Sequence, residues 1–457
     1  MPINDCHDIT NSSEAIPLSE RKSALTMGLL WLTMVASFPA VLAGFEWYRQ
    51  GITLPQLAFC GAISVLLLLL YSVPACQLGA KTGLGYCRLG QTVFGRWGGA
   101  LLTINLLWLF VAWYSLTAVL MAQAVLNLFH WHLPLFWLSV IFAFLMAFNN
   151  FFGFTGVANF ARFMAAPVLI AWAGYVLWKA LHDPVPSALV DLPHPSNLYA
   201  LSLTSSFIIG FAVWGNEQDY WRYSKPGILR SAIPLLLAIV IGQIIFPLAG
   251  WFIARASGSI DYPSTLAFMS NYCFGGIAIV GLLILTADYF STNDSSLFGG
   301  AVAVGSLVPL THTLSVAVFA ISGAVGAALL SLTDMTQSLS ALVSINCVIL
   351  PTPTIIMVTE WCLQERVFRS NSLTQNTNDF KQLPAVHIPA IVALIGGIAI
   401  GIATSGLISI LDFCHFGIAA LNAWLTSVVI YVPLRVHEYS HNKPLIEQYT
   451  QLEVDAE

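Results

Sequence analysis

The chain has 457 residues, of which 57% are hydrophobic and 9% charged, and its formal net charge is −5. Soluble domains are about 45–50% apolar and about 25% charged, so this composition excludes an ordinary soluble protein and predicts a polytopic membrane protein. No basic stretch points to nucleic acid, and the eight cysteines show no metal-ligand spacing. We expect a lipid bilayer around the chain, with no cofactor and no obligate protein partner.

The apolar runs are continuous, which predicts membrane helices and not the alternating strands of a barrel. At about 20 residues for each span, the length fits about ten to twelve helices, and we expect twelve. A polar tail at 1–20, which lacks the apolar core of a cleaved signal peptide, precedes them. The expected spans lie near 24–45, 53–77, 97–128, 133–153, 159–180, 199–218, 231–254, 274–292, 308–331, 337–359, 386–408 and 412–434. The region 299–331 is rich in Gly, Ala and Ser, and a re-entrant segment is the alternative there.

The distribution of basic residues gives an orientation. Twelve spans place both ends of the chain on one side of the membrane. If that side is the cytoplasm, only Arg49, Lys179 and Arg255 lie outside, which leaves fourteen of the 17 Lys and Arg inside. This asymmetry follows the positive-inside rule. The sequence therefore predicts a multi-pass protein of the cell membrane with cytoplasmic tails at 1–20 and 435–457.

Helix-breaking residues recur in the first and sixth expected spans. The first contains Gly28, Pro39 and Gly44, and the sixth contains Gly210 and Gly215. Interruptions at corresponding positions of two halves are typical of transporters built from inverted repeats, whose substrate site lies near the middle of the membrane. Glycine and proline are also common in membrane helices in general, so the pattern alone leaves both interpretations open.

An aromatic residue and an amide share a face of the third span. Asn105 and Trp108 are three residues apart, and an indole beside an amide suits a flat, polar, heteroaromatic ligand. In the sixth span, Phe207 and Phe211 are one turn apart and can form a second stacking wall, although helix packing is the alternative for each. We assign Trp113 to the packing or interface tryptophans.

Asp288 lies in a long apolar run that begins at Phe274. An acid at the centre of a membrane helix costs about 2.5–3.5 kcal/mol, so it is a functional candidate by default. Ser291 and Thr292 share its helix face and add two hydroxyls, which makes a set of hard oxygen ligands for a small cation or a proton. The alternative is a structural acid that is hydrogen-bonded within the bundle. We expect Asn293 and Asp294 near the helix end, where water solvates them.

These features together resemble the nucleobase–cation symporter-1 family, and within it the bacterial cytosine permease branch. The likeness extends from about residue 20 to 435. The matching stretches are 21–22 (RK), 79–84 (GAKTGL), 94–95 (FG), Asn105-x-x-Trp108, 206–208 (SFI), Asp219-x-x-Arg222 and 291–294 (STND). The resemblance implies a LeuT-like fold, with inverted five-helix repeats at 21–180 and 181–360 and two further helices within 386–434.

The resemblance also implies the roles of individual residues. A nucleobase-like ring would lie between Trp108 and a sixth-span aromatic, with Asn105 in the place of a glutamine. A sodium ion would lie between the first and eighth spans. Its implied ligands are the backbone carbonyls of Trp31 and Val35, the hydroxyls of Ser291 and Thr292, and Asp288. The family often has asparagine where this chain has Asp288. The acid favours a ligand edge rich in N–H groups; it can also bind sodium more strongly, or carry a proton.

The sequence therefore predicts a secondary active transporter and not an enzyme. We expect it to import a nucleobase or related heterocycle, of the cytosine, purine, aminopyrimidine, hydantoin or allantoin class, by sodium symport and alternating access. One alternative is proton-coupled transport of another small polar solute on the same fold. Another is an intramembrane aspartyl protease, which needs a second acid at the depth of Asp288, whereas Asp219 and Asp334 lie near helix ends. A channel would require rings of polar residues along a pore.

Overall fold

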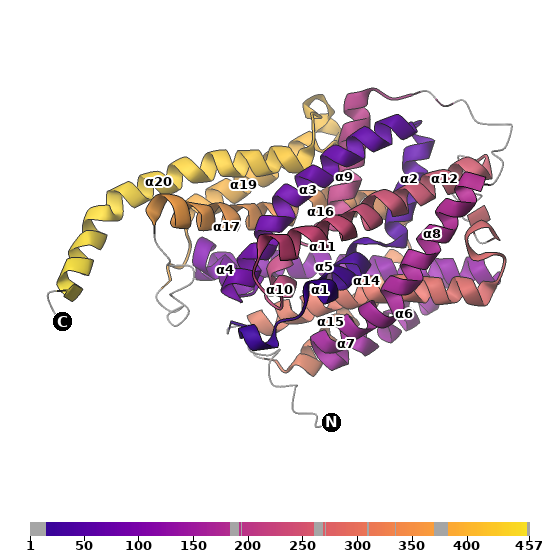
Figure 1. Cartoon of the computed structure of the whole chain (residues 1–457), viewed down its shortest axis with the longest axis horizontal. Coiled ribbons are helices and arrows are strands. Elements are labelled where there is room, and N and C mark those ends of the chain that lie inside the picture. The colour runs from indigo at the N-terminus through magenta and orange to yellow at the C-terminus, as the bar shows by residue number, and fades with distance from the viewer. Residues whose placement is uncertain are drawn as a thin grey trace.

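The computed structural model describes residues 15–182, 192, 194–259, 268–269, 271–308, 310–333, 335–369 and 383–454. Nearly all of this part of the chain is helical, and its β-type pairing is an isolated bridge between Lys22 and Ser224. The tail through residue 14, Asp334 and Lys381 lie outside the described residues. The helices pack as one elongated bundle, with two late helices along one edge (Figure 1).

The first part of the bundle contains eight α-helices. They are α1 (Ala24–Val35), α2 (Phe38–Arg49), α3 (Leu54–Thr82), α4 (Tyr86–Phe94), α5 (Arg96–Phe129), α6 (Leu135–Leu145), α7 (Gly153–Phe160) and α8 (Ala166–His182). The second part contains α9 (Asn197–Ala212), α10 (Glu217–Trp221), α11 (Ile228–Val240), the π-helix η5 (Ile241–Ile245), α12 (Phe246–Ser257), α14 (Ala278–Leu307), α15 (His312–Leu330), α16 (Met335–Ile349) and α17 (Pro351–Leu363). The edge helices are α19 (Ile388–Thr404) and α20 (Ala419–Val454).

The expected all-helical, multi-pass architecture is confirmed. Seven helical segments of the described chain are long and apolar enough to cross a membrane, and the bent pair α1 and α2 makes eight. The helices α9 and α19 are shorter and apolar. Each expected span overlaps a helix, while the count of twelve spans and the division into repeats stay predictions.

The first expected span is broken at its middle. The helix α1 ends at Val35, α2 begins at Phe38, and the two are bent by 49°. Ala36 and Ser37 between them have extended backbones. Pro39 lies in the first turn of α2, where proline fits because its missing N–H would have no partner in the helix.

The sixth expected span is broken in the same manner. The helix α9 ends at Ala212, and α10 begins only at Glu217. Gly215 in the gap has a φ of +79°, a left-handed conformation that strongly favours glycine. Both predicted interruptions are therefore present. They leave backbone groups near the middle of the bundle without partners in their own helices.

The helix α14 differs from the expected eighth span. The expected span was 274–292, but α14 continues to Leu307 and α15 follows at His312, so the described residues show no re-entrant segment there. Small residues allow neighbouring helices to pack closely against it. A Cβ atom on Gly299 would lie 2.4 Å from the Phe110 ring, and one on Gly300 would lie 2.0 Å from the Phe319 ring. Close packing thus keeps this polar, glycine-containing stretch helical.

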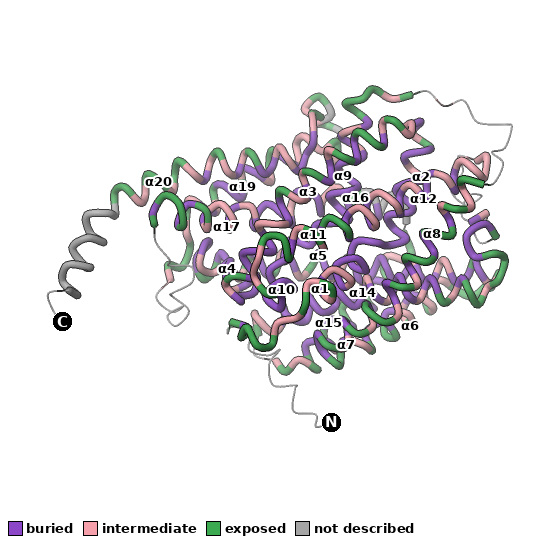
Figure 2. The backbone as a smooth tube through the Cα atoms, in the orientation of Figure 1, coloured by how far each residue is buried: buried purple, intermediate pink, exposed green. Residues whose placement is uncertain are grey.

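Burial is greatest where the two breaks meet the long central helices. Figure 2 shows buried residues concentrated along α1, α10 and α14, whereas the outer faces of the surrounding helices are exposed. Those exposed faces carry large apolar side chains such as Leu70, Ile141 and Val325. Such a surface suits lipid, and the buried interior is where polar groups can act.

Candidate substrate and ion site

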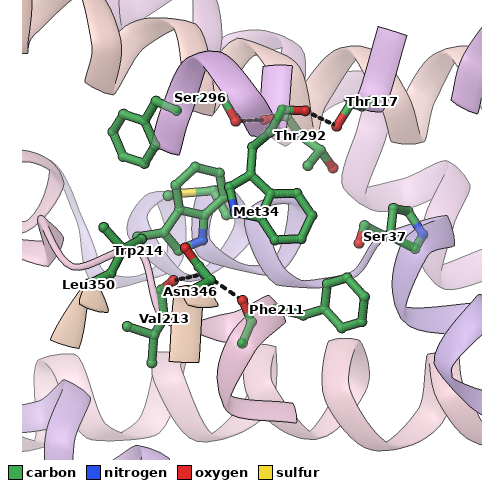
Figure 3. A pocket seen from close by; sticks show the side chains of 14 residues that line it. Met34, Ser37, Thr117, Phe211, Val213, Trp214, Thr292, Ser296, Asn346 and Leu350 are labelled. Carbon is green, nitrogen blue, oxygen red and sulfur yellow. Dashed lines mark hydrogen bonds between the residues drawn. The ribbon is translucent and has the colours of Figure 1, made fainter. Parts of the chain in front are cut away.

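A pocket lies at the level of both helix breaks. It encloses about 440 Å³, including its part open to solvent. Residues of both breaks and of α5, α14 and α16 form its walls. Figure 3 shows their side chains converging on this space. The polar groups among them are Ser37, Thr117, Thr292, Ser296 and Asn346.

Four aromatic rings of this pocket form two contacting pairs, in each of which the ring planes are inclined by 56°. The rings of Trp113 and Phe211 have centroids 5.8 Å apart, and so do the rings of Phe110 and Trp214. In each pair one ring comes from α5 and the other from α9 or the break that follows it. Rings at this spacing and tilt contact each other, and together they give the pocket an apolar wall against which a flat ring can stack.

The structure corrects the predicted contribution of α5. Trp108 is 45% exposed on the outer side of the helix, and its Nε1 donates to Asn105 Oδ1 at 3.1 Å. These two residues engage each other and do not line the pocket. Trp113 lies five residues further on, which is a rotation of about 140° around a helix with 3.6 residues per turn. The helix therefore presents Trp113 and Thr117 to the pocket in place of Trp108 and Asn105.

The structure also distinguishes the two aromatic residues predicted in the sixth span, because only one of them lines the pocket. Phe211 lines the pocket, whereas Phe207 is buried beside it, with ring centroids 5.9 Å apart. Of the two predicted alternatives, the geometry favours Phe211 as a wall. Sequence analysis missed Trp214, although an aromatic residue directly before the break glycine Gly215 was an available signal.

Side chains from other helices hold the free ends of the first break. Asp288 of α14 is fully buried, and its Oδ2 accepts a hydrogen bond from the Phe38 N–H at 2.9 Å, which caps α2. Gln243 of η5 donates through Nε2 to the Val35 carbonyl at 2.7 Å, where α1 ends. Because backbone groups in the membrane interior must find protein partners, these contacts make the break stable. The second oxygen of Asp288, Oδ1, has no hydrogen-bond partner.

A buried carboxylate, that of Glu217, accepts hydrogen bonds from the backbone of the second break. Glu217 Oε1 accepts hydrogen bonds from the backbone N–H groups of Trp214 at 3.0 Å and Gly215 at 3.2 Å. The Tyr71 hydroxyl donates to Glu217 Oε2 at 2.7 Å. The unwound segment is therefore fixed to α3 through a fully buried side chain, and the pocket wall that it forms is preorganised.

Residues of α16 and α17 hold the carbonyls of the same break. Asn346 Nδ2 donates to the Gly210 carbonyl at 2.6 Å and to the Val213 carbonyl at 3.2 Å. Thr354 Oγ1 donates to the Gly215 carbonyl at 2.5 Å. Figure 3 shows Asn346 and Val213 on one wall of the pocket. Asn346 thus joins the break to the pocket interior, and sequence analysis did not identify it.

The predicted ion ligands partly come together at the first break. Thr292 lines the pocket, and its hydroxyl lies 3.4 Å from the Thr33 carbonyl of α1. The Ser291 hydroxyl donates to the Asp288 carbonyl at 3.0 Å within α14. Trp31 is fully buried in α1. The described residues contain no group of three His, Cys, Asp or Glu side chains suited to a metal ion, so a cation here would be held mainly by hydroxyl and carbonyl oxygens.

The prediction that water solvates Asn293 and Asp294 is wrong. Both are fully buried, because α14 continues well past them to Leu307. Asp294 accepts hydrogen bonds from the side-chain amides of Asn149 at 2.8 Å and Asn150 at 3.0 Å. These contacts tie α14 to the turn between α6 and α7, so Asp294 has a structural role away from the pocket.

Comparison of the sequence with known proteins finds no matching family model. The chain is similar to proteins named cytosine permease from Escherichia coli K12 and from Escherichia coli O157:H7. Each is 24% identical to it over 323 residues, which cover 69% of this chain and 72% of the relative.

Comparison of the structure gives a more extensive match. Mhp1, a nucleobase-cation-symport-1 family transporter in a closed conformation with bromovinylhydantoin bound, aligns with a TM-score of 0.73 and 16% identity over 94% of this chain and 96% of that one. The predicted resemblance to this family is confirmed. An inward-facing conformation of Mhp1 aligns with a TM-score of 0.66 and 17% identity over 92% and 93% of the two chains. The fold is LeuT-like, and the relatives are permeases and transporters, not enzymes.

Proposed function

We propose that the protein imports a nucleobase or related heterocycle across the cell membrane by cation symport, with sodium as the coupling ion and both termini in the cytoplasm. The observation that carries this proposal is the aromatic pocket at the two helix breaks. Trp113 and Phe211 offer ring faces, while hydroxyls and one amide surround them. The cytosine in the name of the sequence relatives and the hydantoin bound to Mhp1 both contain a flat polar ring of the matching kind.

The proposed sodium site connects elements that alternating access must separate. A ligand shifts a conformational equilibrium only through different affinities for the two states. An ion held between the end of α1 and Thr292 of α14 would bind only while those helices are close, as they are here, with 3.4 Å between Thr292 Oγ1 and the Thr33 carbonyl. Sodium would then favour the conformation in which the pocket is complete.

Proton coupling is a second candidate because of Asp288. This acid is fully buried, and its Oδ1 has no hydrogen-bond partner. A carboxyl group in that setting can take up a proton when no cation is near. Asp288 therefore has one role under each proposal. It is a negative charge beside the ion in sodium coupling, and it carries the proton in proton coupling.

A thermal-shift screen tests the proposed function directly. Purified protein is heated with cytosine, uracil, adenine, hydantoin or allantoin, each with sodium and with choline replacing sodium. A ligand at about 100 times its Kd stabilises the folded form by about 2.7 kcal/mol. We expect at least one ring to raise the melting temperature, and sodium to increase that shift. If none of the five rings stabilises the protein in either salt, the proposal is overturned.

The Thr292→Val variant should weaken the dependence of binding on sodium, because it removes a hydroxyl from the proposed ion site and keeps the side-chain shape. We expect the sodium concentration for half-maximal stabilisation to rise at least about tenfold, which corresponds to about 1.4 kcal/mol. Thr103→Val is the matched control, since the buried Thr103 hydroxyl donates to the Gly99 carbonyl of its own helix and does not line the pocket. An unchanged sodium dependence in Thr292→Val would remove sodium from this position.

A further inference from the structure

The amide of Asn346 has a fixed orientation. Its nitrogen donates to two backbone carbonyls, Gly210 at 2.6 Å and Val213 at 3.2 Å. Carbonyl oxygens can only accept, so the NH2 group must face the break and the amide cannot turn over without losing both bonds. Asn346 Oδ1 is thereby directed away from the break. It is buried and has no hydrogen-bond partner, in a residue that lines the pocket.

Three of the four hydroxyl groups of the pocket, those of Thr117, Thr292 and Ser296, are also committed as donors. Thr117 Oγ1 donates to the Trp113 carbonyl at 2.8 Å. Thr292 donates to the Thr33 carbonyl, and Ser296 donates to the Thr292 carbonyl at 3.5 Å. Each of these hydroxyls keeps only lone pairs for a ligand, because its single proton is already used. Apart from the indole N–H of Trp214, which is buried without a hydrogen-bond partner, these groups therefore offer acceptors to a ligand.

The position of Asn346 determines which part of a ligand it can meet. Asn346 extends from α16 to the break that carries Trp214, and it lies beside the wall that includes Phe211 (Figure 3). A flat ring held between aromatic faces turns its edge, and not its face, toward the remaining walls. A buried acceptor on such a wall can be satisfied only by an N–H or O–H group on that edge.

We propose that Asn346 is a specificity-determining residue, whose Oδ1 accepts a hydrogen bond from an unsubstituted ring N–H of the transported heterocycle. This inference rests on the proposed function and deepens it. The preferred class is a cyclic amide or ureide that carries such an N–H. A ring that is alkylated at that nitrogen leaves the buried oxygen without a partner, and the site rejects it for that reason.

The test compares ligands in the intact protein. A radiolabelled parent ring, chosen as whichever of the five screened rings stabilises the protein most, is displaced by the unlabelled parent and by each of its ring N-methyl derivatives. We expect one ring N-methyl derivative to bind at least about tenfold more weakly than the parent, because leaving a buried acceptor unpaired has a cost of that size. Equal affinity of every ring N-methyl derivative and the parent would overturn the proposal.

Variants of Asn346 then identify the group that discriminates. In Asn346→Ala the parent and the N-methyl derivative should bind within about threefold of each other. Asn346→Ser is the second variant, because a serine hydroxyl can still donate to one carbonyl of the break if the alanine variant does not fold. If Asn346 only held the break together, both ligands would lose affinity equally and the ratio would stay at tenfold, which would also overturn the proposal.

Thr354→Val is the matched control for the loss of a hydrogen bond to the break. Thr354 also donates from α17 to a break carbonyl, that of Gly215, but it does not line the pocket. We expect this variant to keep the full discrimination between the two ligands. A result in which none of the five rings of the thermal-shift screen binds would reject the proposed function itself, whereas parent binding without discrimination would reject only the role of Asn346.

Discussion

We expect the Asp288→Asn variant to fold and to lose most of its cation-driven uptake. Asparagine keeps one oxygen that can accept the Phe38 N–H, so the cap on α2 is retained while the negative charge is removed. Two unit charges about 4 Å apart at an effective dielectric constant of about 20 interact with about 4 kcal/mol. Half-maximal uptake should therefore require at least about tenfold more sodium, measured as initial rates in proteoliposomes with an imposed sodium gradient.

The neighbouring acid Asp294 provides the matched control. It lies in the same helix and is equally buried, but its partners are the amides of Asn149 and Asn150. The Asp294→Asn variant removes the same charge away from the pocket, and its half-maximal sodium concentration should change by less than about threefold. If Asp288→Asn keeps normal sodium-driven uptake, the acid has no part in coupling. If uptake in the unmodified protein follows a proton gradient without sodium and only Asp288→Asn abolishes it, the result assigns the coupled proton to Asp288.

Asp288→Ala separates the cap from the charge. Alanine removes both, so the Phe38 N–H at the start of α2 loses its acceptor within a region that excludes water. The loss of a helix cap costs about 0.5–2 kcal/mol. We therefore expect Asp288→Ala to melt at a lower temperature than Asp288→Asn. Equal melting temperatures would show that the hydrogen bond seen at Phe38 does not support the break.

Much of the architecture could be predicted from the sequence because its physical signals are strong. The apolar runs require helices, since a backbone in lipid must bond within its own segment. Gly215 and Pro39 occupy positions that suit a left-handed turn and a first helical turn. Asp288 stands out because an acid in an apolar run needs a partner, and the structure supplies the N-terminus of α2.

The orientation of α5 could not be predicted, and for that reason the tryptophan that lines the pocket was not identified. In a soluble protein, the polar face of a helix indicates which side is exposed to water. A membrane helix faces lipid that is as apolar as the protein core, so its sequence does not show which side is outermost. Trp108 and Trp113 are then equivalent in the sequence, and only packing shows that Trp108 is exposed while Trp113 lines the pocket.

Isolated polar residues were missed for a related reason. Asn346 and Gln243 stand singly in apolar helices, and their roles depend on break carbonyls more than a hundred residues away in the chain. The error at Asp294 came from the helix boundary. The stretch after Thr292 is polar and rich in small residues, which suggests a helix end, whereas its contacts with Phe110 and Phe319 keep it helical.

Replacing Trp113 with alanine should weaken heterocycle binding at least about tenfold while the protein remains folded. The ring lines the pocket and contacts the Phe211 ring, at a centroid distance of 5.8 Å. Stacking of a base on an aromatic side chain contributes about 1–3 kcal/mol, and each 1.4 kcal/mol is a factor of ten in affinity. Displacement of a radiolabelled parent ring measures the change, and the melting temperature without ligand reports the fold.

The Trp108→Ala variant makes this test specific to one face of α5. It removes the same side chain from the same helix, but from a site that is 45% exposed and bonded only to Asn105. We expect its affinity to stay within about twofold of the unmodified protein, since no contact with the pocket is lost. The reverse result, with Trp108→Ala weakening binding and Trp113→Ala leaving it unchanged, would place the ring on the other side of the helix. The pocket would then have no role in recognition, because its α5 wall depends on the orientation in which Trp113 and Thr117 face inward.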